Sequence, residues 1–278
     1  MKNIPAFGNK TLTADELREI YSRPAAGENT GENAAAQAQQ QAAEQMSYDG
    51  GTSQGSARPM TYESTIQKTV LLFVVLLATA SVGWFIPLLA LPAAIVGLVL
   101  GLVNSFKREP SPALIMTYAA VQGVFLGGIS GILNAQWAGI VSQAVMGTLI
   151  VFGVTLLLFR SGKVRTSPRF TKIIMIAMIG YFAFSLVNFG LILTGTVTDP
   201  WGMRGATVFG IPLGLLIGAV AVFLAAYSLV MDFEMIQNGV QRRVDDKYSW
   251  AGAFGLIVTL VWLYVEILRI LAILRGDD

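Results

Sequence analysis

The stretch WLYVEILRILAILR, residues Trp262–Arg275, carries one acidic side chain, Glu266, among leucine, isoleucine and valine. It belongs to an apolar segment over residues 249–274. A transmembrane helix needs about 20 such residues to cross the hydrocarbon core of a bilayer. A charge at that depth costs roughly 2.5 kcal/mol or more. Glu266 therefore needs a partner, a proton or a function.

The composition of the whole chain is that of a polytopic membrane protein. Of 278 residues, 54% are hydrophobic and only 13% are charged, against about 25% charged residues in an ordinary soluble domain. The net charge of +2 gives no reason to expect a nucleic-acid partner. Histidine and cysteine are absent from the sequence, which excludes disulfides, His/Cys metal sites and Ser–His or Cys–His catalytic pairs. We expect neither an enzyme nor a bound cofactor.

Seven apolar segments predict an all-α membrane protein with a bundle of seven transmembrane helices. They span residues 68–86, 88–105, 112–133, 138–159, 172–195, 207–231 and 249–274. Pro87 and Pro92 allow two interpretations of the second segment. We favour a tight hairpin between the first two helices over one long re-entrant unit.

The chain before the first segment has a different composition. It includes the run NAAAQAQQQAAEQ and is rich in alanine, glutamine, glycine and serine. Such a segment buries too little apolar surface to offset its chain entropy. We predict a disordered polar tail on the cytoplasmic side over residues 1–65 and a transmembrane domain over residues 66–278.

Basic residues indicate the orientation of the chain. One set of connections and helix ends holds Lys107, Arg108, Arg160, Lys163, Arg165, Arg169, Lys172, Arg242, Arg243 and Lys247. The opposite set holds only Arg204, Arg269 and Arg275. Because lysine and arginine are enriched in cytoplasmic loops, we expect the N-terminus inside and the C-terminus outside.

Glycines recur at four-residue spacing in three of the segments. Such seams let transmembrane helices approach one another closely, and we favour this packing role over an ion-lining role. The seams are Gly97 and Gly101, then Gly123, Gly127 and Gly131, then Gly210, Gly214 and Gly218.

Asp232 is the leading candidate partner of Glu266. We expect the sixth helix to continue to about Gln241 and the seventh to start near Tyr248, which leaves the two carboxyls about 5–13 Å apart in height. Helix tilt or an irregular turn would have to close that gap, so the sequence permits a contact without requiring it. Two carboxyls in contact would share a proton and could change charge near neutral pH.

Two other arrangements remain open. Glu266 and Arg269 are three residues apart and lie on one helix face, so they can form an ion pair near the outer interface. Glu234 can replace Asp232 as the partner, or it can be a solvated neighbour.

Three motifs resemble the Bax inhibitor/YccA-like family, also described by the transmembrane Bax inhibitor motif. They are YAAVQGVFLGGIS (Tyr118–Ser130), MDFEMIQNGV (Met231–Val240) and AFGLIVTLVWLYVEILRILAILR (Ala253–Arg275). The stretch MTYESTIQKT resembles the bacterial branch, and the likeness covers residues 61–275. It implies a bacterial inner-membrane protein with the last helix central. It also implies that Asp232 and Glu266 form a pH-sensitive switch on a calcium leak.

The chain departs from that family at three points. The interval between Asp232 and Glu266 is longer than in better-known relatives, and the final acid is glutamate where many relatives have aspartate. Gln122 occupies a place where the bacterial branch is expected to have glutamate. A di-acid intramembrane protease built on the same two residues is chemically conceivable, but glutamate fits that dyad poorly and the surrounding motifs are absent.

Two functions follow from these observations. The first is a pH-gated cation leak. Calcium takes six to eight oxygen ligands, and fewer side-chain oxygens are offered by Asp232, Glu266, Asn188 and Gln122. This predicts a weak, transient calcium site on Asp232 and Glu266. The second is a scaffold in the lipid bilayer that modulates a membrane protease or a stress response, with the N-terminal tail as its handle.

Overall fold

A computed structural model describes residues 58–276 of the chain. The predicted disordered tail over residues 1–65 lies outside the described residues as far as position 57, and its last part was predicted wrongly because residues 62–65 form the first turn of a helix. Within the described part, seven helices are long and apolar enough to cross a membrane. The helices are α3 (Tyr62–Phe85), α4 (Ala90–Phe106), α5 (Pro112–Gln136), α6 (Ile140–Arg160), α7 (Pro168–Leu193), α8 (Leu213–Gln241) and α9 (Ser249–Gly276). The predicted all-α membrane protein with a seven-helix bundle is confirmed.

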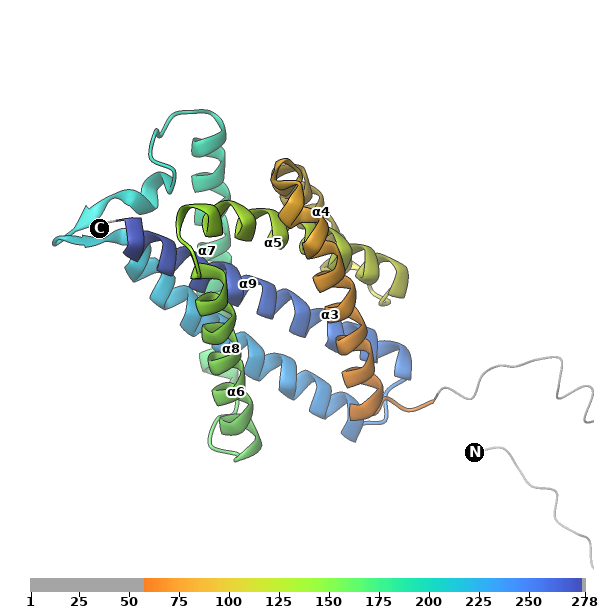
Figure 1. Cartoon of the computed structure of the whole chain (residues 1–278). Coiled ribbons are helices and arrows are strands. Elements are labelled where there is room, and N and C mark those ends of the chain that lie inside the picture. The colour runs from red at the N-terminus through yellow and green to blue at the C-terminus, as the bar shows by residue number, and fades with distance from the viewer. Residues whose placement is uncertain (1–57, 277–278) are drawn as a thin grey trace, which may run out of the picture. The chain divides into compact units, whose positions relative to one another are not determined.

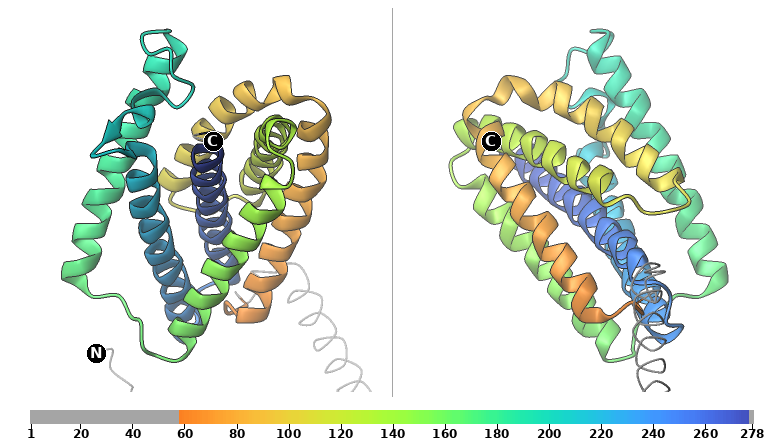
Figure 2. Two further views of the ribbon diagram at one scale, coloured as in Figure 1. Left: turned by 60° about the vertical axis from the view of Figure 1, so that its left-hand side comes forward. Right: turned by 90° about the vertical axis from the view of Figure 1, so that its right-hand side faces the viewer.

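The last helix is central, as the family resemblance implies. α9 packs against α3, α5, α6 and α8, and Figures 1 and 2 show it running through the middle of the bundle. α7 lies at the edge and contacts mainly α8 and the short helix η2 (Gly202–Gly205). Residues on α9 can therefore meet side chains from most of the bundle.

Most predicted helix boundaries lie within four residues of those in the structure, and the starts of α3 and α8 differ by six. α3 begins at Tyr62 rather than at residue 68, because Thr61 caps it by accepting a hydrogen bond from the Ser64 backbone N–H at 3.1 Å. The short helix η1 (Pro87–Leu89) makes the tight hairpin expected between α3 and α4. α8 ends at Gln241 as predicted.

The start of the sixth segment was predicted wrongly. Residues 207–212 form a small hairpin of β1 (Thr207–Val208) and β2 (Ile211–Pro212), and α8 starts only after it. Phe209 and Gly210 have positive φ angles of 55° and 79°, which close the two-residue turn of a hairpin and cannot continue a right-handed helix. Gly210 therefore belongs to a turn and not to a helix seam.

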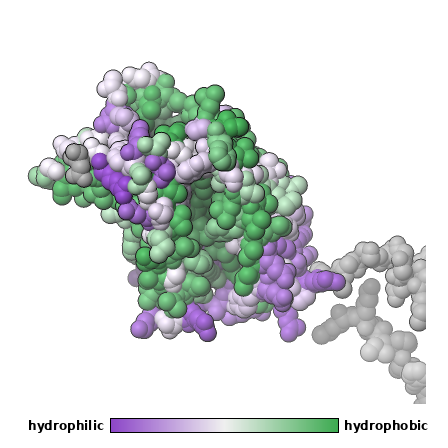
Figure 3. Space-filling model, viewed as in Figure 1, coloured by the Kyte–Doolittle hydropathy of each residue, from purple (hydrophilic) through white to green (hydrophobic). Residues whose placement is uncertain are grey.

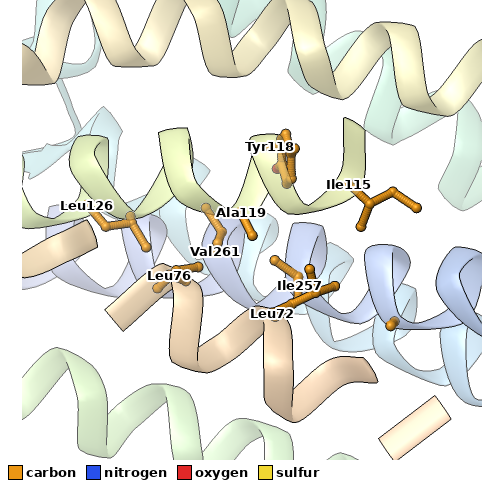
Figure 4. Packing of buried hydrophobic residues seen from close by; sticks show 9 residues of the cluster. Leu72, Leu76, Ile115, Tyr118, Ala119, Leu126, Ile257 and Val261 are labelled. Atoms are coloured by element: carbon orange, nitrogen blue, oxygen red, sulfur yellow. The ribbon is translucent and has the colours of Figure 1, made fainter. Parts of the chain in front are cut away.

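The remaining glycine seams are packing surfaces. A Cβ on Gly123 or Gly127 of α5 would overlap the backbone of α3 at Leu76 or Ala80. Gly214 and Gly218 of α8 likewise face isoleucine side chains of α9. Figure 4 shows the apolar core where α3, α5 and α9 meet. Its buried members are Leu72, Leu76, Ile115, Tyr118, Ala119, Leu126, Ala253, Ile257 and Val261.

Polar contacts tie the start of α3 to the connection between α8 and α9. The Met60 N–H donates to the Val244 carbonyl at 2.7 Å, and the Asp246 N–H donates to the Arg58 carbonyl at 2.8 Å. Lys68 adds an ion pair with Asp246 at 2.8 Å. We call the end of the bundle that carries residues 58–61, 107–111, 161–167 and 242–248 the basic end.

The surface seen in Figure 3 is mainly hydrophobic over the middle of the helices and hydrophilic toward their ends. An open apolar groove of about 750 Å³ is lined by residues of α3, α5, α6 and α9. Neither Asp232 nor Glu266 lines it. The candidate ionisable site therefore lies elsewhere in the bundle.

Candidate functional site

Glu266 is buried and both of its carboxylate oxygens are occupied. Only 1% of the residue is exposed. One oxygen, Oε1, accepts hydrogen bonds from Arg269 Nη1 at 2.5 Å and from the Tyr181 hydroxyl. The other, Oε2, accepts from Arg204 Nη1 at 3.4 Å. The ion pair with Arg269 that the sequence left open is present, with the Glu266 side chain buried and the Arg269 side chain 24% exposed.

Arg204 completes this group and was not predicted as a site residue. It is only 2% exposed. Its Nη2 donates to the Tyr181 hydroxyl at 3.0 Å and to Ser185 Oγ at 3.1 Å. The guanidinium also lies over the rings of Tyr181 and Phe184, 5.3 and 5.4 Å from their centroids. We call Glu266, Arg204, Arg269, Tyr181 and Ser185 the charge cluster.

The sequence contains one signal that points to Arg204. It is the only basic residue between Lys172 and Arg242. Arg204 was assigned from the sequence to a solvated loop. A lone arginine beside apolar segments can instead turn toward the protein interior, as Arg204 does. With two guanidinium groups and one carboxylate, the charge cluster has one formal positive charge in excess.

Asn188 holds the segment that carries Arg204. Its Nδ2 donates to the Trp201 carbonyl at 3.2 Å and its Oδ1 accepts from the Met203 N–H at 2.7 Å. Tyr181, Ser185 and Asn188 are spaced by four and three residues, so they share one face of α7. Asn188 therefore supports the charge cluster through η2, and its side-chain oxygen is not free to bind an ion.

Asp232 has different surroundings. Its Oδ2 accepts a hydrogen bond from Thr259 Oγ1 on α9 at 2.7 Å. Gly255 of α9 provides room for the carboxyl, since a Cβ there would lie 2.7 Å from Asp232 Oδ1. No lysine or arginine among the described residues forms an ion pair with it. Asp232 is thus a partly buried carboxyl with a neutral partner.

The expected contact between Asp232 and Glu266 is absent. Thr259, the partner of Asp232, lies about two turns before Glu266 on α9, or roughly 10 Å along the axis. α8 and α9 are both continuous helices through this region, so no irregular turn closes the height difference. The hypothesis of a proton shared directly between the two carboxyls is wrong for this structure.

The predicted calcium site on Asp232 and Glu266 would need the two carboxyls side by side, and the structure does not bring them together. The two carboxyls lie at different heights, and the oxygens of Glu266 face donors. Within residues 58–276, no group of three or more acidic, histidine or cysteine side chains gathers as a metal site.

The other predicted residues take structural places. Glu234 accepts hydrogen bonds from the backbone N–H of Thr166, at 2.9 Å, and from its hydroxyl, so it holds the connection between α6 and α7. It is not the partner of Glu266. Gln122 lies where α5 packs on Gly97 of α4, and its buried Oε1 has no hydrogen-bond partner among the described residues.

The fold and this site define a seven-helix membrane protein with a carboxylate–arginine cluster on its central helix. The family model described as Bax inhibitor 1 like matches residues 23–276. The chain belongs to that family. The match begins inside the N-terminal region, earlier than the resemblance over residues 61–275 suggested. A search of curated proteins found no match to this chain.

Proposed function

We propose that the protein is a pH-sensitive cation leak of a bacterial cytoplasmic membrane, with calcium as the permeant ion. The observation that carries the proposal is the pair of contrasting carboxyls on the facing helices α8 and α9. Within residues 58–276, Asp232 has only the neutral donor Thr259, whereas two arginines balance Glu266. Ionisable groups at membrane depth usually face a bundle interior or a water-filled cavity and mark ion or proton pathways.

The two carboxyls, Asp232 on α8 and Glu266 on α9, act one after the other and not as one dyad. Ionised Asp232 attracts a cation, and uptake of a proton removes that attraction. The excess positive charge of the charge cluster repels cations at the next step and keeps the leak small. The leak is therefore expected to be larger at alkaline pH than at acidic pH.

The test is calcium flux into liposomes that contain the full chain and an enclosed calcium indicator. Asp232→Asn keeps an oxygen for the Thr259 hydroxyl but removes the charge. We expect it to lower the alkaline flux and to abolish the pH dependence. Glu234→Gln is the matched control, because it removes a carboxylate from the same helix at a position that faces the α6–α7 connection. Equal flux in the wild type and Asp232→Asn would refute the role of Asp232.

A non-transporting regulator of a membrane protease or stress response is the second candidate. It is favoured by the hydrogen bonds to both carboxylate oxygens of Glu266, because such bonds also fit a purely structural contact between α7, η2 and α9. Deletion of residues 1–57 separates the two functions. A leak should persist without this region, whereas a regulator that uses it as a handle should lose its effect.

A further inference from the structure

Trp262 lies on α9 between the two carboxyl sites. Thr259, Trp262 and Glu266 are spaced by three and four residues, so all three share one face of the helix. One turn separates the indole from the partner of Asp232, and one turn separates it from Glu266. Any direct path along this face from Asp232 to the charge cluster passes Trp262.

Side chains from α7 and α8 surround the indole. Its ring centroid is 5.4 Å from that of Tyr181, which itself donates to Glu266. Trp262 also packs on an apolar cluster built on α7 and α8 that includes Met231, the residue before Asp232. The buried members of that cluster are Ile174, Leu224 and Tyr227, with Met178, Tyr181 and Met231 packed against them. Trp262 and the residue next to Asp232 therefore pack on the same mainly apolar cluster.

The polar atom of the indole does not bridge them. Trp262 Nε1 is buried and has no hydrogen-bond partner among the described residues. An indole N–H is a donor only, so it offers a cation no oxygen ligand. An unpaired buried donor is also unfavourable for stability, which makes packing alone a weak explanation for tryptophan at this position.

We propose that Trp262 is the barrier that separates the Asp232 site from the charge cluster, and that its removal joins them into one polar path for cations. A smaller side chain would leave a space with Asp232 and Thr259 at one end and Glu266 and Tyr181 at the other. Water occupies a space of this kind when polar groups line it. The inference rests on the proposed leak and adds a steric barrier to the electrostatic one at the charge cluster.

Thiol labelling tests the barrier without measuring flux. The chain has no cysteine, so Thr259→Cys and Ser185→Cys place single thiols beside Asp232 and in the charge cluster, respectively. A membrane-impermeant thiol reagent is added to one face of the membrane at a time. We expect Trp262→Ala to raise labelling of each thiol from its far side by about tenfold or more, because access no longer requires local opening.

Two substitutions control for shape and stability. Trp262→Phe keeps an aromatic plug without the N–H and should leave labelling unchanged. Trp250→Ala removes a tryptophan of α9 that packs instead on the core of α3, α5 and α9, and it should not raise far-side labelling. If Trp262→Ala does not assemble, Trp262→Leu gives the same comparison. Far-side labelling that does not change on shortening Trp262 overturns the proposal.

The same variants in the flux assay separate failure of the barrier from failure of the leak. Raised labelling with no calcium flux in any variant would leave the barrier standing and remove the leak. A wild-type flux that depends on pH, together with unchanged labelling in Trp262→Ala, would keep the leak and remove the barrier. Raised far-side labelling together with raised calcium flux in Trp262→Ala supports both.

Discussion

At the scale of single residues, the cost of burying Glu266 is offset by its donors. Among the described residues, Glu266 and Arg204 are the only charged residues that are almost fully buried. Replacing a whole buried ion pair with apolar groups can be neutral, but removing one member leaves an uncompensated charge and costs about 3–5 kcal/mol. The contrast with Asp232, whose hydrogen bond is to a neutral hydroxyl, makes this difference measurable.

Glu266→Gln is expected to lower the free energy of unfolding by about 3–5 kcal/mol. The glutamine leaves Arg204 and Arg269 close together without a carboxylate between them. Asp232→Asn should change the free energy of unfolding by no more than about 1 kcal/mol, because the amide oxygen still accepts the hydrogen bond from the Thr259 hydroxyl. Both changes are measured by unfolding of the detergent-solubilised protein.

A double substitution checks the cause. The double variant Arg204→Gln/Glu266→Gln buries one positive charge fewer than Glu266→Gln alone. Its loss of unfolding free energy should therefore be smaller than the sum of the losses in the two single variants, by about 0.5–3 kcal/mol. Additive losses would show that Arg204 and Glu266 do not interact energetically.

At the scale of secondary-structure elements, the helices are held in two different ways. α3 and α5 approach backbone to backbone through glycines, which favours van der Waals packing in lipid. α7 has no such glycine contact and combines an apolar cluster with α8 and polar contacts, including the hydrogen bond between the Thr171 and Tyr227 hydroxyls at 2.8 Å and those of the charge cluster. A larger side chain in place of a glycine should therefore destabilise the protein most at the contact between α3 and α5.

Gly127→Ala is expected to destabilise the protein by about 1–3 kcal/mol, the usual cost of overpacking. Its Cβ would overlap the Ala80 carbonyl, and backbone atoms cannot move aside as a flexible side chain can. Gly153→Ala of α6 is the control, since a Cβ there meets nothing within 4 Å. Unfolding measurements that rank the two variants equally would contradict the close approach of α3 and α5.

At the scale of the whole molecule, charge is distributed unevenly between the two ends of the bundle. The basic end carries most of the lysines and arginines in the connections, including Lys107, Arg108, Arg242, Arg243 and Lys247. At the opposite end, Arg204 is buried against Glu266. The solvated basic charge is therefore even more one-sided than a count along the sequence suggests.

The basic end is expected to face the cytoplasm. Single cysteines at Ser161 and Arg243 should react with an impermeant thiol reagent only from the inside, and a cysteine at Thr196 only from the outside. The absence of native cysteine makes the background low. Labelling of Thr196→Cys from the inside would reverse the orientation.

The sequence predicted most of the fold for a simple physical reason. Apolar runs long enough to span a bilayer define helices locally, and glycine spacing defines where they approach. The end of α8 at Gln241 and the start of α9 at Ser249 followed from the same local patterns. The hairpin over residues 207–212 was missed because positive φ angles at Phe209 and Gly210 leave no trace in an apolar segment.

By itself, the sequence determined a seven-helix membrane protein with acidic residues, Asp232 and Glu266, inside two long apolar helices, because hydropathy and charge are properties of single residues. Only the tertiary structure decided which groups those acids meet. Arg204 and Tyr181 reach Glu266 from η2 and α7, and two helical turns with Trp262 between them separate Glu266 from the partner of Asp232. Pairing depends on the relative heights and rotations of packed helices, and those are fixed by contacts between residues far apart in the chain.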